Sequence, residues 1–231
     1  QKAIEELKDN YFQNIVVFFY LFRYNNKVHK NKEEFEMNIG IDIDGVIADI
    51  SRFIIDFGTK FRYENNITTK ICENEYDEAK ALGLTDEQAE KFWNEYLTYY
   101  ASKYPVRDFT SDVIKKLRKQ GHKIFIITAR NEDGLPPETY GTMQTMVKNW
   151  LKENDIEYDG LEFTAGSKLP YCKRNNIDVM IDDSPTNVLD ISTKIPVLCF
   201  DNPYNKTLTG NNITRVYGWY EILYKIENKE F

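Results

Sequence analysis

The sequence predicts an α/β fold in which helices cover both faces of a doubly wound parallel sheet. From residue 38 onward, short runs of apolar and mostly β-branched residues alternate with stretches whose apolar residues recur at helical spacing. Strands that alternate with helices are joined by right-handed crossovers, which place them parallel in one sheet. Several of the runs end in acidic or hydroxyl side chains, and open sheets of this kind bind ligands at the carboxyl ends of their strands.

The first expected strand covers residues 39–41 and leads directly into Asp42 and Asp44, before a turn at Gly45. Both carboxylates are then presented at the carboxyl end of the strand. Carboxylates this close repel unless a cation or an electropositive site lies between them, so a divalent metal is the expected neutraliser. The alternative is a core strand that ends in an ordinary Asp-Gly turn. An EF-hand loop is excluded by spacing, because glycine is the fourth residue rather than the sixth and Phe53 is the twelfth.

Residues 1–36 are predicted to be an N-terminal helical extension, the tail of an upstream module. Their apolar run at 15–22 (IVVFFYLF) is too short to span a bilayer, which needs ~20 residues. The run is typical of a helix that packs on the core, on a second copy of the chain, or on an upstream domain. A homodimer and an upstream-domain contact are therefore both open.

Residues 50–108 are predicted to form a small helical cap inserted after the first strand, between core segments 37–49 and 109–231. Thr85 and Gln88 make a capping box, and the helix that they open is expected to end before Pro105. This helix carries a largely aromatic stripe on two neighbouring faces, Phe92, Tyr96 and Tyr99 on one and Trp93, Leu97 and Tyr100 on the other. Such a stripe usually belongs to the core, and the alternative is a wall of the site that stacks on a substrate.

The second strand is expected at residues 123–127, after a short helix at 111–120. The strand runs into a small polar segment, Thr128-Ala129-Arg130. A hydroxyl and free backbone N–H groups at the carboxyl end of a strand make a natural phosphate cradle. The alternative is that these residues simply begin a loop.

The rest of the chain continues the alternation. Three further strands are expected at residues 161–163, 179–181 and 195–200, and helices at 143–151 and 219–226. Lys168 opens another helix after the first of these strands. A lone lysine is usually a solvated surface residue, so Lys168 is a candidate site residue only in combination with the other groups at the strand ends.

Two adjacent acids, Asp182 and Asp183, close the strand at residues 179–181 and repeat the arrangement at Asp42. The alternative is helix capping, because Ser184 and a proline follow and acids before Ser-Pro favour a helix start. Which of the two acids would bind a metal directly is open at this stage.

Composition excludes several classes of function. The chain has 231 residues and a formal net charge of −7, which disfavours a protein that coats nucleic acid or an anionic membrane. The sequence has only two histidines, which excludes a histidine-rich metal site and disfavours a Ser-His-Asp triad. The three cysteines form no CxxC pair and no even set, so the expected compartment is reducing and the expected location cytoplasmic.

Four strand ends thus carry Asp-x-Asp, Thr, a downstream Lys and Asp-Asp, in that order. The segments DIDGVIAD, ITAR, SKLP and IDDSP together resemble the four motifs of the haloacid dehalogenase superfamily of phosphatases, over about residues 38–226. Within that superfamily the chain resembles the 5′(3′)-deoxyribonucleotidase-type group, which also has a helical cap after the first motif.

The resemblance implies a role for each motif residue. Asp42 would attack phosphorus and form an aspartyl-phosphate, and Asp44 would be the general acid and base. Mg²⁺ would be the cofactor, and its ligands would be Asp42, Asp44 through its backbone carbonyl, and the pair Asp182 and Asp183. The phosphoryl group would be bound by Thr128, the Ala129 N–H and Lys168, with Arg130 beside them facing phosphate or base.

The expected activity is Mg²⁺-dependent hydrolysis of a small phosphorylated metabolite, foremost a nucleoside monophosphate. The same chemistry on a sugar or polyol phosphate is the first alternative, and phosphoryl transfer to a second substrate is another. A non-catalytic regulatory module attached to an upstream enzyme is an alternative of a different class. Against it, every motif group named above is intact.

Overall fold

A computed structural model describes residues 35–133, 135, 137–139 and 141–231. The chain divides into two compact units, 1–35 and 36–231, and everything below concerns the second. The helical extension predicted for residues 1–36 lies, apart from its last two residues, outside the described residues. None of the helices in the described part is long and apolar enough to cross a membrane.

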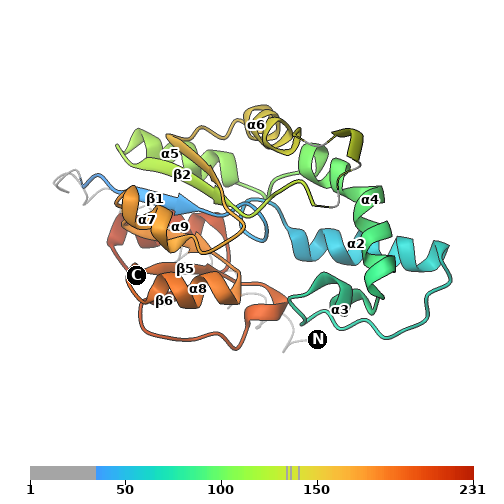
Figure 1. Ribbon diagram of the computed structural model, residues 1–231. Coiled ribbons are helices and arrows are strands. Elements are labelled where there is room, and N and C mark those ends of the chain that lie inside the picture. The colour runs from blue at the N-terminus through green and yellow to red at the C-terminus, as the bar shows by residue number, and fades with distance from the viewer. Residues whose placement is uncertain (1–34, 134, 136, 140) are drawn as a thin grey trace, which may run out of the picture. The chain divides into compact units, whose positions relative to one another are not determined.

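A single parallel sheet forms the centre of the unit (Figure 1) and confirms the predicted fold class. Its strand order is β3-β2-β1-β4-β5-β6, so the chain builds outward from β1 first in one direction and then in the other. This reversal places β1 beside β4, and the crevice at such a switch point is where doubly wound sheets bind ligands. The strands are β1 (Asn38–Ile41), β2 (Lys123–Thr128), β3 (Gly160–Phe163), β4 (Val179–Asp182), β5 (Val197–Phe200) and β6 (Ile213–Val216).

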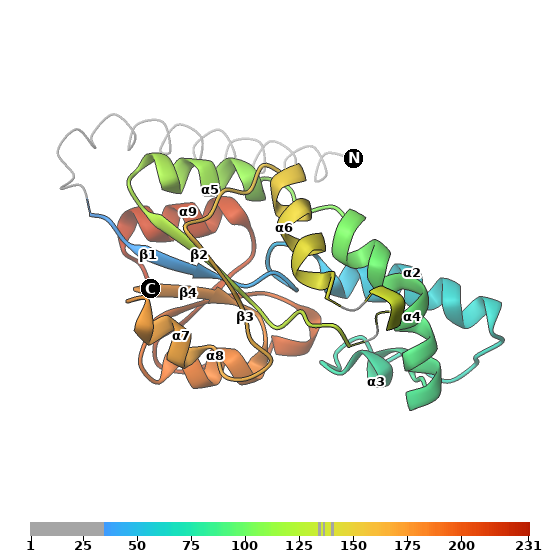
Figure 2. The same cartoon turned by 45° about the horizontal axis from the view of Figure 1, so that its top comes forward.

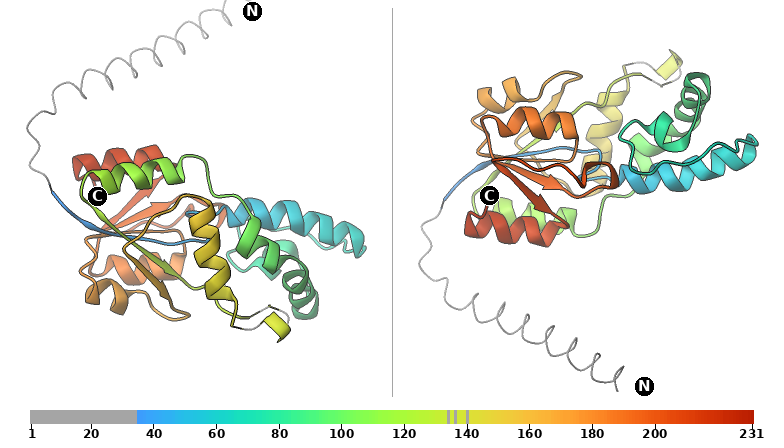
Figure 3. Two further views of the ribbon diagram at one scale, coloured as in Figure 1. Left: turned by 90° about the horizontal axis from the view of Figure 1, so that it is seen from above. Right: turned by 90° about the horizontal axis from the view of Figure 1, so that it is seen from below.

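Helices cover both faces of this sheet, as Figures 2 and 3 show, with α5 (Thr110–Lys119) and α9 (Trp219–Asn228) on one side. The other side is covered by α7 (Leu169–Arg174) and α8 (Pro185–Ser192). Because strand side chains alternate, β4 feeds both layers: Val179 and Ile181 belong to one apolar cluster and Met180 to the other. Burial on both faces explains why these strands are continuous apolar runs in the sequence.

The sixth strand, β6, was not predicted. It pairs with β5 at the edge of the sheet, and three of its four residues, Ile213, Thr214 and Arg215, are only partly buried. Arg215 instead forms an ion pair with Asp201, at 2.7 Å. An edge strand with one polar and one charged residue out of four lacks the apolar run by which the other strands were predicted.

Three helices lie between β1 and α5 and extend beyond the carboxyl ends of the strands (Figure 1). They are α2 (Ile50–Glu64), α3 (Glu78–Leu82) and α4 (Asp86–Lys103). The predicted capping box of Thr85 and Gln88 is present at the start of α4. Residues 50–108 are called the cap below, and the division of the chain into cap and core remains a prediction.

The remaining helix, α6 (Met143–Glu153), packs against α4. Its Trp150 is fully buried and donates its indole N–H to the carbonyl of Tyr104, at 2.7 Å. The contact ties the core to the end of the cap, next to the strand ends that carry the candidate site.

Candidate active site

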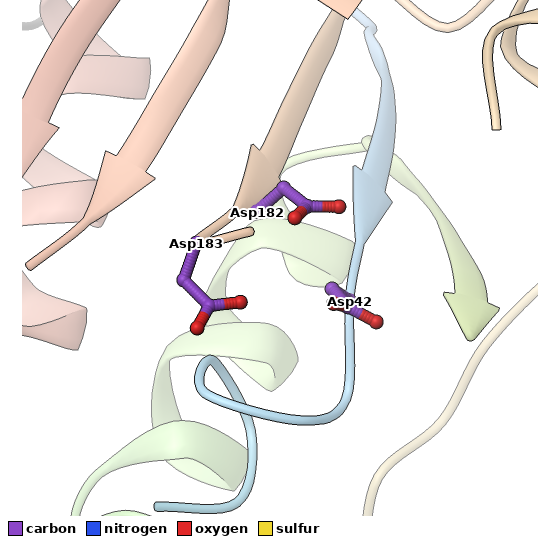
Figure 4. Close-up of side chains that lie close together, drawn as sticks. All are labelled: Asp42, Asp182 and Asp183. Atoms are coloured by element: carbon purple, nitrogen blue, oxygen red, sulfur yellow. The ribbon is translucent and has the colours of Figure 1, made fainter. Parts of the chain in front are cut away.

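Three carboxylates meet where β1 and β4 end (Figure 4). Asp42 follows β1, Asp182 is the last residue of β4, and Asp183 is the next residue along. Because β1 and β4 are neighbours in the sheet, oxygens of all three side chains lie within 4.8 Å of one another. All three residues are almost fully buried, with exposed fractions of 6%, 0% and 2%.

Lys168 is the cation of this cluster. Its ammonium lies 2.8 Å from Asp42 Oδ1 and 2.8 Å from Asp182 Oδ2, and the residue is 1% exposed. Burial lowers the pKa of this lysine, but the two carboxylates outweigh it, so its pKa is raised and the side chain stays charged. One ammonium beside three carboxylates leaves the buried cluster with excess negative charge.

The burial and crowding of these acids shift their pKa values. Burial, opposed by Lys168 and reinforced by Asp182, raises the pKa of Asp42 to about 7. Burial and its two acidic neighbours also raise the pKa of Asp183 well above its usual value. A divalent cation would remove this cost, and oxygen ligands at the end of a parallel sheet suit Mg²⁺.

The hydrogen bonds within the cluster distinguish the two acids of the pair. Asp182 uses one oxygen for Lys168 and the other for the N–H of Ser184, at 3.0 Å. The described side-chain hydrogen bonds to Asp183 both fall on Oδ2, and Figure 4 shows its carboxylate turned towards Asp42. The geometry therefore fits a cation between Asp42 and Asp183, with Asp182 holding the lysine.

Asp44 lies apart from the three-carboxylate cluster. Its Oδ1 accepts from Arg130 Nη2 at 2.8 Å, from Arg130 Nε at 3.0 Å and from the hydroxyl of Tyr100 at 2.7 Å. Burial raises the pKa of Tyr100 well above its usual value, so that hydroxyl remains a donor. The Arg130 guanidinium also lies over the rings of Tyr100 and Trp150. In this structure Arg130 orients Asp44, whereas the sequence suggested a contact with phosphate or base.

The predicted phosphate cradle is partly covered. Thr128 is fully buried, and its Oγ1 accepts from the N–H of Arg130 at 3.2 Å. Ala129 is exposed and lines a pocket of about 530 Å³ that opens in front of the acids. Thr128 and Lys168 are not among the residues that line the pocket, and Lys168 contacts the lining residue Asp42.

The pocket extends from the carboxylates at the strand ends to the cap. Asp42, Asp44 and Asp183 line one end, and Trp93 and Leu97 of α4 line the other. Its volume falls in the ordinary range for small-molecule sites, about 300–1,000 Å³. The pocket can therefore hold a phosphate group at the acids and a leaving group against the cap.

The aromatic residues of the cap divide between the two roles that the sequence left open. Phe53 is fully buried, packs on Phe57 at a ring distance of 4.6 Å and belongs to the core, as does Tyr96. Trp93 is half-buried and lines the pocket. Within the stripe, Phe92 and Tyr96 belong to the core, whereas Trp93, Leu97 and Tyr100 line the pocket. Of these three, Trp93 is the half-buried aromatic ring.

Sequence reasoning missed Asn202 and Tyr204, which both donate hydrogen bonds to Asp183. They follow β5, whose predicted end at residue 200 is one more strand end on the same edge. The rule that found the other site residues would have found these two, had it been applied to the residues after the fifth strand.

A prediction concerns Gly45, whose φ is +83° and whose added Cβ would lie 1.8 Å from Asp183 Oδ2. We expect Gly45→Ala to displace Asp183 and to abolish any rise in melting temperature that Mg²⁺ causes in the wild-type protein. Gly141→Ala is the control: its φ is +86° and no described atom lies within 4 Å of the new Cβ. Both should cost ~1–2 kcal/mol through left-handed strain, but a metal response retained in Gly45→Ala would contradict the close packing.

Two solved structures share this fold. A haloacid dehalogenase-like hydrolase from Streptococcus pneumoniae matches with a TM-score of 0.56 at 17% identity, over 83% of this chain and 98% of that one. A beta-phosphoglucomutase from Clostridium difficile matches with a TM-score of 0.51 at 14% identity, over 84% and 96%. The fold is that of the haloacid dehalogenase-like hydrolases.

Sequence comparison narrows this class. A nucleotidase from Clostridium acetobutylicum is 32% identical over 190 residues, which cover 81% of this chain and 92% of that protein. The model of the family "5' nucleotidase, deoxy (Pyrimidine), cytosolic type C protein" matches residues 36–231. The chain belongs to this nucleotidase family, and it is a phosphatase of the haloacid dehalogenase superfamily. The predicted resemblance is confirmed.

Proposed function

We propose that this protein is a Mg²⁺-dependent phosphomonoester hydrolase that acts through an aspartyl-phosphate on Asp42, foremost on a nucleoside monophosphate. The observation that carries the proposal is the buried cluster of Asp42, Asp183 and Lys168 at the end of a pocket of about 530 Å³. An excess of buried negative charge at one end of a pocket favours binding of a divalent cation and of the phosphate that accompanies it.

Asp42 and Asp183 would hold the metal through their carboxylates, and Asp44 through its backbone carbonyl. Bound Mg²⁺ would offset the charge of the phosphate, so that a carboxylate can approach it. Asp182 contributes differently, because its hydrogen bonds already go to Lys168 and Ser184. This assigns the direct contact to Asp183 and the orientation of Lys168 to Asp182.

In the proposed reaction, Asp42 forms a bond to phosphorus while the bond from phosphorus to the leaving oxygen breaks. Asp44 gives a proton to that oxygen and later takes one from the water that hydrolyses the aspartyl-phosphate, a role typically worth ~10²–10⁴-fold in rate. Arg130 and Tyr100 fix the Asp44 carboxylate for both steps. Lys168 and the Ala129 N–H offset the charge on the phosphoryl oxygens.

Trp93 favours a nucleotide, because a half-buried indole in the pocket can stack on a base. The acids Glu75, Glu78 and Glu90 favour the alternative, a sugar or polyol phosphate, since they also line the pocket and accept hydrogen bonds from hydroxyls. The proposed location is the cytoplasm, since all three cysteines are free.

The experiment is phosphate release across nucleoside monophosphates and sugar phosphates, with Mg²⁺ and with a chelator. We expect Trp93→Ala to raise KM for nucleotides by ~5- to 100-fold, the loss of one base-aromatic stack, with less effect on sugar phosphates. Tyr99→Ala, an exposed aromatic on the same helix, is the control. Equal KM effects on the two substrate classes would favour the alternative, and no release from any monoester would refute the proposed function.

The metal response should depend on pH. Because burial raises the pKa of Asp42 to about 7, protonation stabilises the folded metal-free protein below the unfolded pKa of ~4, and this stabilisation is lost as pH rises through about 7. Mg²⁺ binds the ionised form. We therefore expect Mg²⁺ to raise the melting temperature more at about pH 8 than at about pH 5.5. A shift of equal size at both pH values would contradict the assignment of the buried acids as ligands.

A further inference from the structure

We propose that Asn202 and Tyr204, on the loop that follows β5, are positioning residues that orient Asp183 for the metal. The inference rests on the proposed metal site and goes beyond it, because it assigns a role to a fifth strand end. Asn202 and Tyr204 contact the ligand rather than the reacting atoms, so their effect should appear in metal affinity before it appears in catalysis.

Both residues bind one oxygen of Asp183. The amide Nδ2 of Asn202 donates to Asp183 Oδ2 at 3.2 Å, and the hydroxyl of Tyr204 donates to the same oxygen. Two donors on Oδ2 fix the rotation of the carboxylate and direct Oδ1 away from them. Figure 4 shows the carboxylate turned towards Asp42, where the cation would lie.

The backbone of Asp183 is held by the same loop. Asn205 donates from Nδ2 to the carbonyl oxygen of Asp183 at 2.8 Å, and its Oδ1 accepts from the N–H of Asn202 at 3.1 Å. Asn202 and Asn205 are 2% and 1% exposed. Main chain and side chain of the proposed ligand are therefore held by one short segment, residues 202–205.

Asn202 also joins the two sides of the site. Its Nδ2 donates to the carbonyl of Gly45 at 3.0 Å, and its Oδ1 accepts from Arg107 Nη2 at 3.2 Å and Ser51 Oγ at 3.1 Å. Arg107 Nη2 also lies 3.3 Å from the Gly45 carbonyl. These contacts determine which way the amide points, and they connect the loop after β1, which carries the nucleophile, to the metal ligand after β4.

Tyr204 extends the network to the cap. Its ring meets the ring of Tyr76 edge to face, with centroids 5.1 Å apart, and both residues line the pocket. Tyr76 lies in the cap segment before α3. The hydroxyl that orients Asp183 therefore belongs to a ring that packs against the cap, so the cap helps to orient the proposed metal ligand.

The test measures the binding of Mg²⁺ alone, without substrate. The melting temperature of the whole protein is recorded at increasing Mg²⁺ concentration and gives an apparent Kd. Outer partners of metal ligands are typically worth ~10- to 100-fold in metal affinity, and we expect Tyr204→Phe to raise the apparent Kd for Mg²⁺ by that factor. Asn202→Leu, which removes the amide donor at similar volume without adding charge, should raise it further. Excess Mg²⁺ should restore kcat in Tyr204→Phe while KM for the monoester stays near that of the wild type.

Tyr220→Phe is the matched control, because it removes a tyrosine hydroxyl that donates to Asp112 on the α5–α9 surface. It should leave the Kd for Mg²⁺ unchanged. A lower melting temperature with an unchanged Kd in Tyr204→Phe would mean a purely structural role and would overturn the inference. The Tyr204→Phe variant keeps the test valid even if Asn202→Leu fails to fold.

The same data separate the inference from the proposed function. A wild-type protein that binds Mg²⁺, loses affinity in Tyr204→Phe and hydrolyses no monoester refutes the function and supports the inference. A wild-type protein whose melting temperature does not respond to Mg²⁺ overturns the inference.

Discussion

Asp42→Asn should lower kcat for phosphate release by at least about 10⁴-fold, the scale on which removal of a nucleophile acts. An amide cannot attack phosphorus to form an acyl phosphate, although it retains the shape of the carboxyl group and an oxygen that can accept from the Ile43 N–H, now 2.7 Å from Oδ1. The substitution also removes one of three crowded acids. We therefore expect the melting temperature to stay the same or rise while turnover is lost.

The control is Asp56→Asn on α2, an exposed acid that pairs with Arg52 at 2.7 Å. It should leave kcat unchanged, because it lies outside the pocket lining. Turnover near the wild-type level in Asp42→Asn would show that another residue is the nucleophile.

Lys168→Met should cause the largest loss of stability among the substitutions considered, about 3–5 kcal/mol of unfolding free energy, as for other broken buried ion pairs. The lysine is 1% exposed and lies 2.8 Å from both Asp42 and Asp182. Without it, two buried carboxylates lose their counter-charge. Activity should fall as well, since the same ammonium holds Asp42, the proposed nucleophile.

Denaturant unfolding at two pH values tests this explanation. Protonation relieves uncompensated carboxylates, so the loss should be smaller at about pH 5 than at about pH 8. Lys173→Met, an exposed position on helix α7, which Lys168 directly precedes, should be nearly neutral at both pH values. A loss that is independent of pH would indicate lost packing rather than lost charge.

The strands that form the centre of the sheet could be predicted because burial on both faces requires continuous apolar runs. The order of the strands could not, because pairing between segments as distant as β1 and β4 depends on how the whole sheet is wound. That order decides the site: Asp42 and Asp183 share one cluster because their strands are neighbours, while β2 and β3 lie between them in sequence.

Charged residues at strand ends were visible in the sequence, but their partners were not. Arg130 was expected at phosphate or base and lies instead on Asp44, 86 positions away. Asn202 and Tyr204 were missed because neutral side chains after a strand resemble an ordinary loop. A single sequence shows which groups reach the edge of the sheet, whereas hydrogen-bond partners depend on distances of a few tenths of an ångström.

The central claim, that Asp42 carries the phosphoryl group, can be tested by an acid quench during turnover followed by peptide mapping. With a monoester whose leaving group is acidic enough to depart without a proton, such as a nitrophenyl phosphate, Asp44→Asn should accumulate the aspartyl-phosphate, because the water that hydrolyses it loses its base. With a monoester labelled in its phosphate and with Mg²⁺ present, we predict label on the peptide that contains Asp42. Product formed with the label on a different residue, or with no labelled peptide in Asp44→Asn, would contradict the account.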